Sequence, residues 1–190
     1  MAEQAKPFLA GSKEVAAVYD VRPLQVSQWV GRGVVDYTHA RIISGSPYWL
    51  LSYVRDFGPA AKRARHPDER ELEKLVEEQS PGRWARSVDE MPPIVGLTEC
   101  AELFHTSREA LSVIARRGGF VPADYRLSGS PLWLLSTVAG PGVYVGPAQA
   151  RKLDWAPDPD VLAALQGGTY DGPGSVIVPR GRAAAKSAEG

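Results

Sequence analysis

The side chains of this chain that could do chemistry are hydrogen-bonding groups spaced along helix-forming segments. One set falls on a single face of a helix expected over 22–32: Arg22, Gln25, Gln28 and Arg32. Glutamine can make paired hydrogen bonds to adenine, and arginine can make them to guanine or hold a phosphate. The opposite face carries Val26, Trp29 and Val30 at helical spacing and would pack inward. The exposed face therefore has the chemistry needed to contact nucleic-acid bases.

Catalytic and metal-binding patterns are not found in the sequence. His39, His66 and His105 have no cysteine or histidine partner at the spacing that zinc sites use. Neither a phosphate-binding loop, nor a dinucleotide fingerprint, nor a serine nucleophile motif is present. We therefore expect no enzymatic activity, no cofactor and no bound metal.

The composition is that of a soluble globular protein. The 190 residues are 44% hydrophobic and 23% charged, and Lys plus Arg (22) balance Asp plus Glu (22). A protein with no net charge has no overall electrostatic attraction to nucleic acid, so binding to nucleic acid would have to depend on local clusters of positive charge. Cys100 is the only cysteine, which excludes an intrachain disulfide. With no apolar signal core or membrane-length apolar run, we expect a cytoplasmic protein without a membrane partner.

An internal duplication sets the domain organisation. The run Arg41–Ser52 returns, one residue shorter, as Arg126–Ser136, and Glu14 aligns with Glu99 ahead of it. The sequence predicts these segments: a first module over 8–58, a linker over 59–92 with a charged helix over 67–79, a second module over 93–140, a Gly/Pro-rich extension over 141–178 and a disordered tail over 179–190.

The same elements are expected in both modules. The helices are predicted over 13–19, 22–32 and 50–57, and again over 99–105, 108–117 and 134–139, with a further one over 158–165. Ser12 and Thr98 are the expected caps of the first helix in each module, and Gly33 and Gly118 the expected ends of the second. Strands are expected over 40–43 and 47–49.

A tight hairpin lies between the second and third helices of each module. The pairs Gly45-Ser46 and Gly129-Ser130 are predicted to form its turn. Pro47 and Pro131 follow directly, so the returning strand is expected to be an edge strand there. The tryptophans that follow, Trp49 and Trp133, are better placed to anchor the hairpin in the core than to stack on bases.

The order helix, turn, helix, glycine, hairpin, tryptophan and helix resembles the excisionase and MerR-type winged helix-turn-helix domains. The residues that carry the resemblance run from Glu14 to Gly33 and continue through the hairpin to Trp49 and Leu51, and the second copy repeats them. It covers about half of the chain. The fold class it implies is mainly α with small β-hairpin wings, as tandem winged helix-turn-helix modules joined by a helical linker.

The resemblance implies that the second helix of each module enters the major groove of double-stranded DNA and that the wing follows the backbone. The residues expected to contact DNA in the second helices and wings, in addition to those of the first helix face, are Arg41, Ser44, Ser46, Ser107, Arg108, Ser112, Arg116, Arg117, Arg126, Ser128 and Ser130. The basic cluster Lys62, Arg63 and Arg65 could be a phosphate clamp, a flexible tether or neither.

Several alternatives stay open at this stage. Arg41 and Arg126 could instead hold a carbonyl or carboxylate of the wing. Ala110 and Val113 stand where the first module has Gln25 and Gln28, so the second helix face could contact protein.

The sequence thus predicts sequence-specific DNA binding at direct-repeat or asymmetric sites by a transcriptional regulator, most simply a repressor acting as a monomer. A recombination directionality factor and a protein-interaction adaptor are the alternatives. An integrase or RNA polymerase is the protein partner that the first two roles imply, and binding to DNA would place the protein at the nucleoid.

Overall fold

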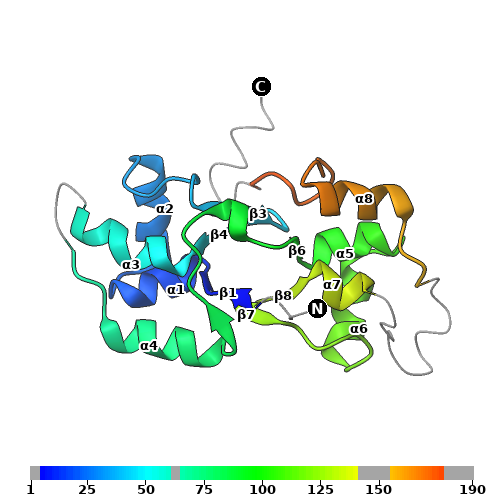
Figure 1. Cartoon of the computed structure of the whole chain (residues 1–190), viewed down its shortest axis with the longest axis horizontal. Helices are drawn as coiled ribbons and strands as arrows, with labels where there is room; N and C mark the ends of the chain where they lie inside the picture. Colours follow the sequence, from blue (N-terminus) through cyan, green and yellow to red (C-terminus); the bar gives the residue numbers. More distant parts are fainter. Residues whose placement is uncertain (1–4, 61–64, 141–154, 178–190) are drawn as a thin grey trace.

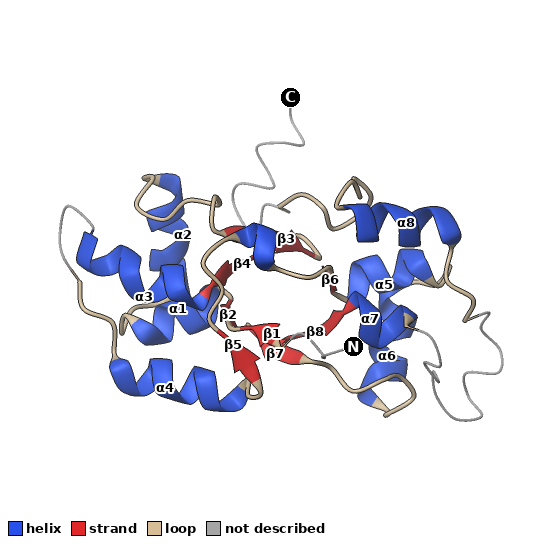
Figure 2. Ribbon diagram, viewed as in Figure 1, coloured by secondary structure: helices blue, strands red, loops and turns tan. Residues whose placement is uncertain are grey.

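A computed structural model describes residues 5–60, 65–140 and 155–177 and shows a mixed α/β chain of short helices and small sheets (Figures 1 and 2). The helices are α1 Ser12–Val18, α2 Pro23–Gly31, α3 Leu51–Ala60, α4 Glu69–Glu78, α5 Leu97–Leu103, α6 Arg108–Arg116, α7 Leu135–Ala139 and α8 Pro159–Gly167, with a 3-10 turn η1 over Val88–Glu90. The strands are β1 Lys6–Pro7, β2 Leu9–Ala10, β3 Ala40–Ile43, β4 Ser46–Leu50, β5 Gly82–Arg83, β6 Ile94–Val95, β7 Tyr125–Leu127 and β8 Ser130–Leu134. Within these ranges, no helix has the length and apolar character to cross a membrane.

The duplication seen in the sequence is present in the structure as two units with the same element order. Each unit has a short strand, two helices, a hairpin and a third helix, and its sheet has the order β2-β4-β3 or β6-β8-β7. The leading strands β2 and β6 were not predicted, because a two-residue strand carries no periodicity to recognise. They pair with the strand that leads into α3 or α7, in matching registers: Leu9 opposite Leu50, and Ile94 opposite Leu134.

The hairpin turn lies one residue earlier than the sequence suggested. Ser44 and Gly45 have φ values of 49° and 74°, and Ser128 and Gly129 have 51° and 79°. Positive φ at both central residues is the type I′ geometry that matches the twist of a two-residue hairpin. This places a serine hydroxyl at each tip. The returning strands β4 and β8 are central in their sheets and not the edge strands expected from Pro47 and Pro131. The prolines are tolerated because β2 and β6 pair only beyond them, with Trp49 and Leu50 and with Trp133 and Leu134.

Local signals place the second helix and the core as expected. Pro23 opens α2, where its missing N–H costs nothing, and Gly33 and Gly118 follow α2 and α6 with φ of 69° and 72°. Trp49 and Trp133 are each 1% exposed. Their indole N–H groups donate to the carbonyls of Asp36 and Val121, respectively. The two tryptophans therefore anchor the hairpins in the core, as predicted.

The repeated unit extends further along the chain than the duplicated sequence. The charged helix predicted over 67–79 is α4, and the helix predicted over 158–165 is α8. The backbone N–H of Asp68, which caps α4, donates to the Val18 carbonyl at 2.7 Å, and that of Asp158, which caps α8, donates to the Leu103 carbonyl at 2.8 Å. Each unit thus ends in a helix docked in the same way on its first helix.

Each unit has an apolar cluster of its own, and the two units are joined by a third cluster that they share. One apolar cluster combines matching residues of both sheets with residues of the intervening segment: Leu9, Ile43, Tyr48, Leu50, Ala85, Met91, Ile94, Tyr125, Leu127 and Leu132. Buried Gln79 joins α4 to this region, because its amide donates to the Leu9 carbonyl and accepts from the Leu9 N–H, both at 2.8 Å. The outer edge of β2 is thereby satisfied without another strand.

Candidate functional site

The two hairpin tips contact the opposite unit. The backbone N–H and hydroxyl of Ser128 donate to the Glu14 carboxylate at 2.7 and 2.8 Å. The backbone N–H and hydroxyl of Ser44 donate to the Glu99 carboxylate at 2.6 Å each. Glu99 is only 3% exposed, and its remaining donor is the Gly96 N–H at 3.0 Å.

These contacts also cap the first helices, which replaces the capping predicted from the sequence. Ser12 and Thr98 lie inside α1 and α5, whose N-caps are Gly11 and Gly96 without a side-chain cap. The hydroxyl of Ser128 instead accepts from the Lys13 N–H at 3.0 Å, and that of Ser44 accepts from the Thr98 N–H at 3.0 Å. A glycine cap leaves room for the incoming serine, which supplies from the other unit what the local residue cannot.

The serines at the tips are therefore engaged inside the protein, and so is one of the two wing arginines. Arg41 donates to the carbonyls of Val88 and Pro92 at 3.2 and 3.0 Å, because the segment that joins the two units passes over β3. Desolvation by burial lowers the pKa of the Arg41 guanidinium. The DNA contacts expected of Ser44, Ser128 and Arg41 are replaced here by intramolecular ones, which for Arg41 is the carbonyl-binding alternative raised from the sequence.

Arg126, the counterpart of Arg41, is exposed and lies in a groove between α6 and its hairpin. This surface, called groove 2 below, has a volume of about 620 Å³ and brings together predicted DNA-contact residues that are separate in the sequence: Arg108, Ser112, Arg116, Arg126 and Ser130. None of its three guanidinium groups forms an ion pair within the described residues. Groove 2 is a concentration of positive charge on a neutral protein.

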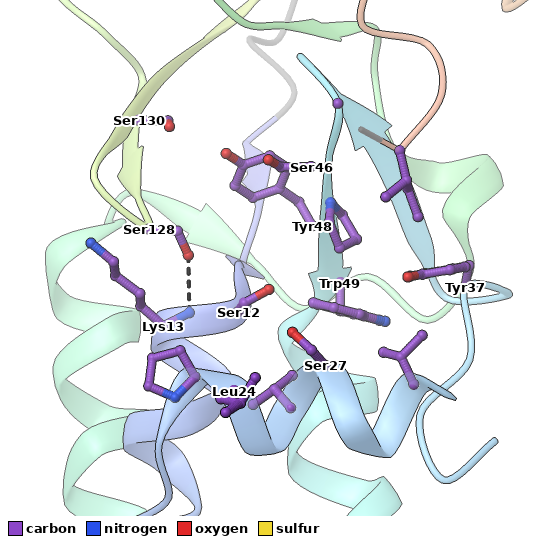
Figure 3. Close-up of a pocket in the computed structure, with 16 residues that line it drawn as sticks. Ser12, Lys13, Leu24, Ser27, Tyr37, Ser46, Tyr48, Trp49, Ser128 and Ser130 are labelled. Atoms are coloured by element: carbon purple, nitrogen blue, oxygen red, sulfur yellow. Dashed lines mark hydrogen bonds between the residues drawn. The ribbon is translucent and has the colours of Figure 1, made fainter. Parts of the chain in front are cut away.

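The corresponding groove of the first unit, groove 1, lies between α2 and β4 and has a volume of about 530 Å³ (Figure 3). Its side chains are more apolar, with Leu24 and Tyr37 among them, and Lys13 is the one cation among its lining residues. The tip of the opposite hairpin reaches this groove through Ser128 and Ser130, and Ile177 of the C-terminal segment also lines it. Ser46, predicted to contact DNA, lies on its wall.

Three of the four polar residues predicted to lie on the exposed face of α2 are exposed in the structure. Arg22, Gln28 and Arg32 are exposed, whereas Gln25 is half-buried. Leu24 is 70% exposed beside them. On α6, Arg117 is exposed, and Ser107 is the N-cap, with its hydroxyl accepting from the Ala110 N–H at 3.1 Å.

The predicted basic cluster is only partly within the described residues. Lys62 and Arg63 lie outside them. The Arg65 guanidinium stacks 4.7 Å from the centre of the Trp29 ring and is half-buried, so its position is set by the core of the first unit.

Sequence reasoning missed Glu14 and Glu99 as structural residues of the site. The two glutamates are identical at aligned positions, which marks them as equivalent residues but does not indicate what they contact. A carboxylate in the first turn of a helix is ordinarily satisfied by its own helix end, as Gly11 and Gly96 partly do here. Comparison with known protein families, characterised proteins and solved structures finds no match for this chain.

Proposed function

We propose that this chain binds double-stranded DNA through the exposed faces of α2 and α6, with groove 2 holding a stretch of phosphate backbone. The observation that carries the proposal is the convergence of Arg108, Arg116 and Arg126 on one groove without an ion-pair partner among the described residues. Three neighbouring cations that pair with no carboxylate of the described residues favour a polyanionic ligand.

The remaining groups of the two helix faces suit the same ligand. The Ser112 and Ser130 hydroxyls in groove 2 can donate to phosphate oxygens, which receive a large share of protein–DNA hydrogen bonds. Gln28 and Arg32 are exposed on α2, and these side-chain types pair with adenine and guanine in the major groove. The order helix, helix, hairpin and helix in each unit supports the proposed winged helix-turn-helix, in which the hairpin tips contact the other unit and the exposed faces of α2 and α6 are available to a ligand.

As biological role we propose transcription regulation, in which the protein represses a promoter by occupying it and excluding polymerase. Two helix faces on one chain would let a monomer cover two adjacent half-sites, where a protein with a single face must dimerise.

The decisive experiment is selection of duplexes from a random pool at about 100 mM salt, followed by binding measurements on the enriched sequence. Arg126→Ala should weaken binding and reduce the slope of log K against log salt by roughly 0.9, the contribution of one phosphate contact. Arg70→Ala, which removes an exposed arginine from α4, is the matched control and should leave both unchanged. A pool without enriched sequences would refute the proposal.

A protein-interaction adaptor is the second candidate, and the exposure of Leu24 is the observation that favours it. Leu24 is 70% exposed at the mouth of groove 1, where Val30 and Tyr37 add further apolar surface. Large apolar groups at a groove mouth are typical of protein contacts. Under this reading, Leu24→Ser would abolish capture of the partner while Arg126→Ala would not, which is the reverse of the result expected for DNA.

A further inference from the structure

The two units contact each other through the same residues in both directions. Glu14 of the first unit receives the tip serine of the second, and Glu99 of the second unit receives the tip serine of the first. The helix-capping contacts repeat this exchange, with matching distances of 3.0 Å at Lys13 and Thr98. A contact in which each side uses the same patch is isologous, and it requires a two-fold axis between the partners.

The shared core and the arrangement of helices have the same symmetry. The cluster between the units contains residues that hold equivalent positions in the two copies, such as Leu9 and Ile94 or Tyr48 and Leu132. In Figure 1, α2 and α4 lie diagonally opposite α6 and α8, as expected for a two-fold axis close to the direction of view. A translation of one unit to the next along the chain would not place them in this way.

We infer that the DNA site consists of two half-sites in inverted orientation, with different base sequences in each. A two-fold axis keeps the component of any direction along the axis and reverses the component across it. The axis exchanges the exposed faces of α2 and α6, so a duplex that crosses the axis meets the two helices with opposite polarity. This is the relation that inverted half-sites present to a symmetric dimer. The inference rests on the proposed function, and it replaces the direct-repeat arrangement suggested by two copies in one chain direction.

The half-sites differ because the helix faces differ. Gln25 and Gln28 of α2 correspond to Ala110 and Val113 of α6, and Leu24 corresponds to Glu109. The two units are thus related by symmetry in their backbone, whereas the residues that would contact bases differ between the two helices. A homodimer would read a palindrome, but this chain should read one half-site with an amide-rich helix and the other with an apolar and acidic one.

Orientation is tested on the sequence that the random pool selects. Gln28→Ala should relax base preference in one half-site and Glu109→Ala in the other, which assigns each helix to its half-site. Reversing one half-site in place, at unchanged length and composition, should lower affinity by at least about tenfold. Equal or tighter binding to the direct arrangement would overturn the inference while leaving the proposed function intact. No enriched sequence at all would overturn both.

A second experiment uses disulfides to hold the two units in this arrangement and measures whether the locked protein still binds DNA. A Cβ atom at Gly11 would lie 3.1 Å from the Ser128 Cβ, and one at Gly96 would lie 3.1 Å from the Ser44 Cβ. The pairs Gly11→Cys with Ser128→Cys and Gly96→Cys with Ser44→Cys should therefore form disulfides within one chain, after a small adjustment of each hairpin tip. The reduced form of the same variant is the control.

We expect the oxidised protein to bind the selected site within about threefold of its reduced form, because the locked arrangement is already the binding one. If oxidation abolished binding that the reduced form retains, the units would have to separate on DNA, and the two-fold relation could not set the orientation of the half-sites.

Discussion

The Glu14 carboxylate accepts hydrogen bonds from both the backbone N–H and the hydroxyl of Ser128, 114 residues further along the chain. Glu99 and Ser44 repeat this relationship from the other side. The two contacts link the halves at the points where each first helix begins. Substitutions at these residues therefore measure how much the packing of the two units depends on two side-chain pairs.

Glu99→Ala should destabilise the protein by about 2–4 kcal/mol, since it leaves the N–H groups of Ser44 and Gly96 without their acceptor in a buried site. The measurement is the free energy of unfolding in urea. Glu102→Ala removes an exposed carboxylate from the same helix and should change that free energy by less than about 0.5 kcal/mol. Equal effects of the two substitutions would show that the contact contributes nothing.

Arg41 and Arg126 are equivalent in sequence and should respond differently to the same substitution. Arg41→Ala removes two hydrogen bonds to the carbonyls of Val88 and Pro92 and should cost about 1–3 kcal/mol of unfolding free energy. Arg126→Ala should leave stability nearly unchanged, because its guanidinium is exposed. Thermal unfolding of both variants, compared with the DNA binding of each, separates the two roles.

The Cys100 thiol should be protected from alkylation in the folded protein. Burial raises its pKa well above the ordinary value, so little thiolate is present, and the side chain is 0% exposed. At pH 8, iodoacetamide should react at least about a hundredfold more slowly with the native than with the urea-unfolded protein. Similar rates would mean that α5 opens readily.

Stability should fall between pH 10 and pH 12, in part through Tyr19. Burial raises the pKa of its phenol to about 12, and the hydroxyl donates to the Val54 carbonyl. Because the unfolded chain ionises near pH 10, stability is full below that pH and is lost as the pH rises toward the folded pKa. Tyr19→Phe should lower stability at pH 8 but flatten its decline from pH 9 to 11, as followed by urea midpoints.

The sequence predicts those elements whose signals are local. Pro23 and Gly33 mark the limits of α2, and Trp49 identifies the anchored hairpin, because each acts through its own backbone or bulk. The short strands β2 and β6 were missed, since their pairing partners decide them. The contact of Glu14 with Ser128 depends on how two distant segments meet, and neither residue type nor spacing encodes that meeting.

The candidate site divides in the same way. Exposure of Arg22, Gln28 and Arg32 follows from helical periodicity and was predictable. The groove that gathers Arg108, Arg116 and Arg126 forms because the hairpin lies beside α6, and the resemblance to winged helix-turn-helix domains had already indicated these three residues. The inward turn of Arg41 was not decidable, because the segment that covers it belongs to neither copy of the repeat.

The exchange of capping serines also has a consequence for how the chain is made. A ribosome releases the first half before the second, so α1 emerges with the Lys13 N–H lacking the acceptor that only Ser128 supplies. The shared apolar cluster that contains Leu9 and Tyr48 likewise forms only after Ile94 and Leu132 have been synthesised. The nascent first half can bury its own apolar cluster, but its contacts with the second half form only after most of the chain has been synthesised.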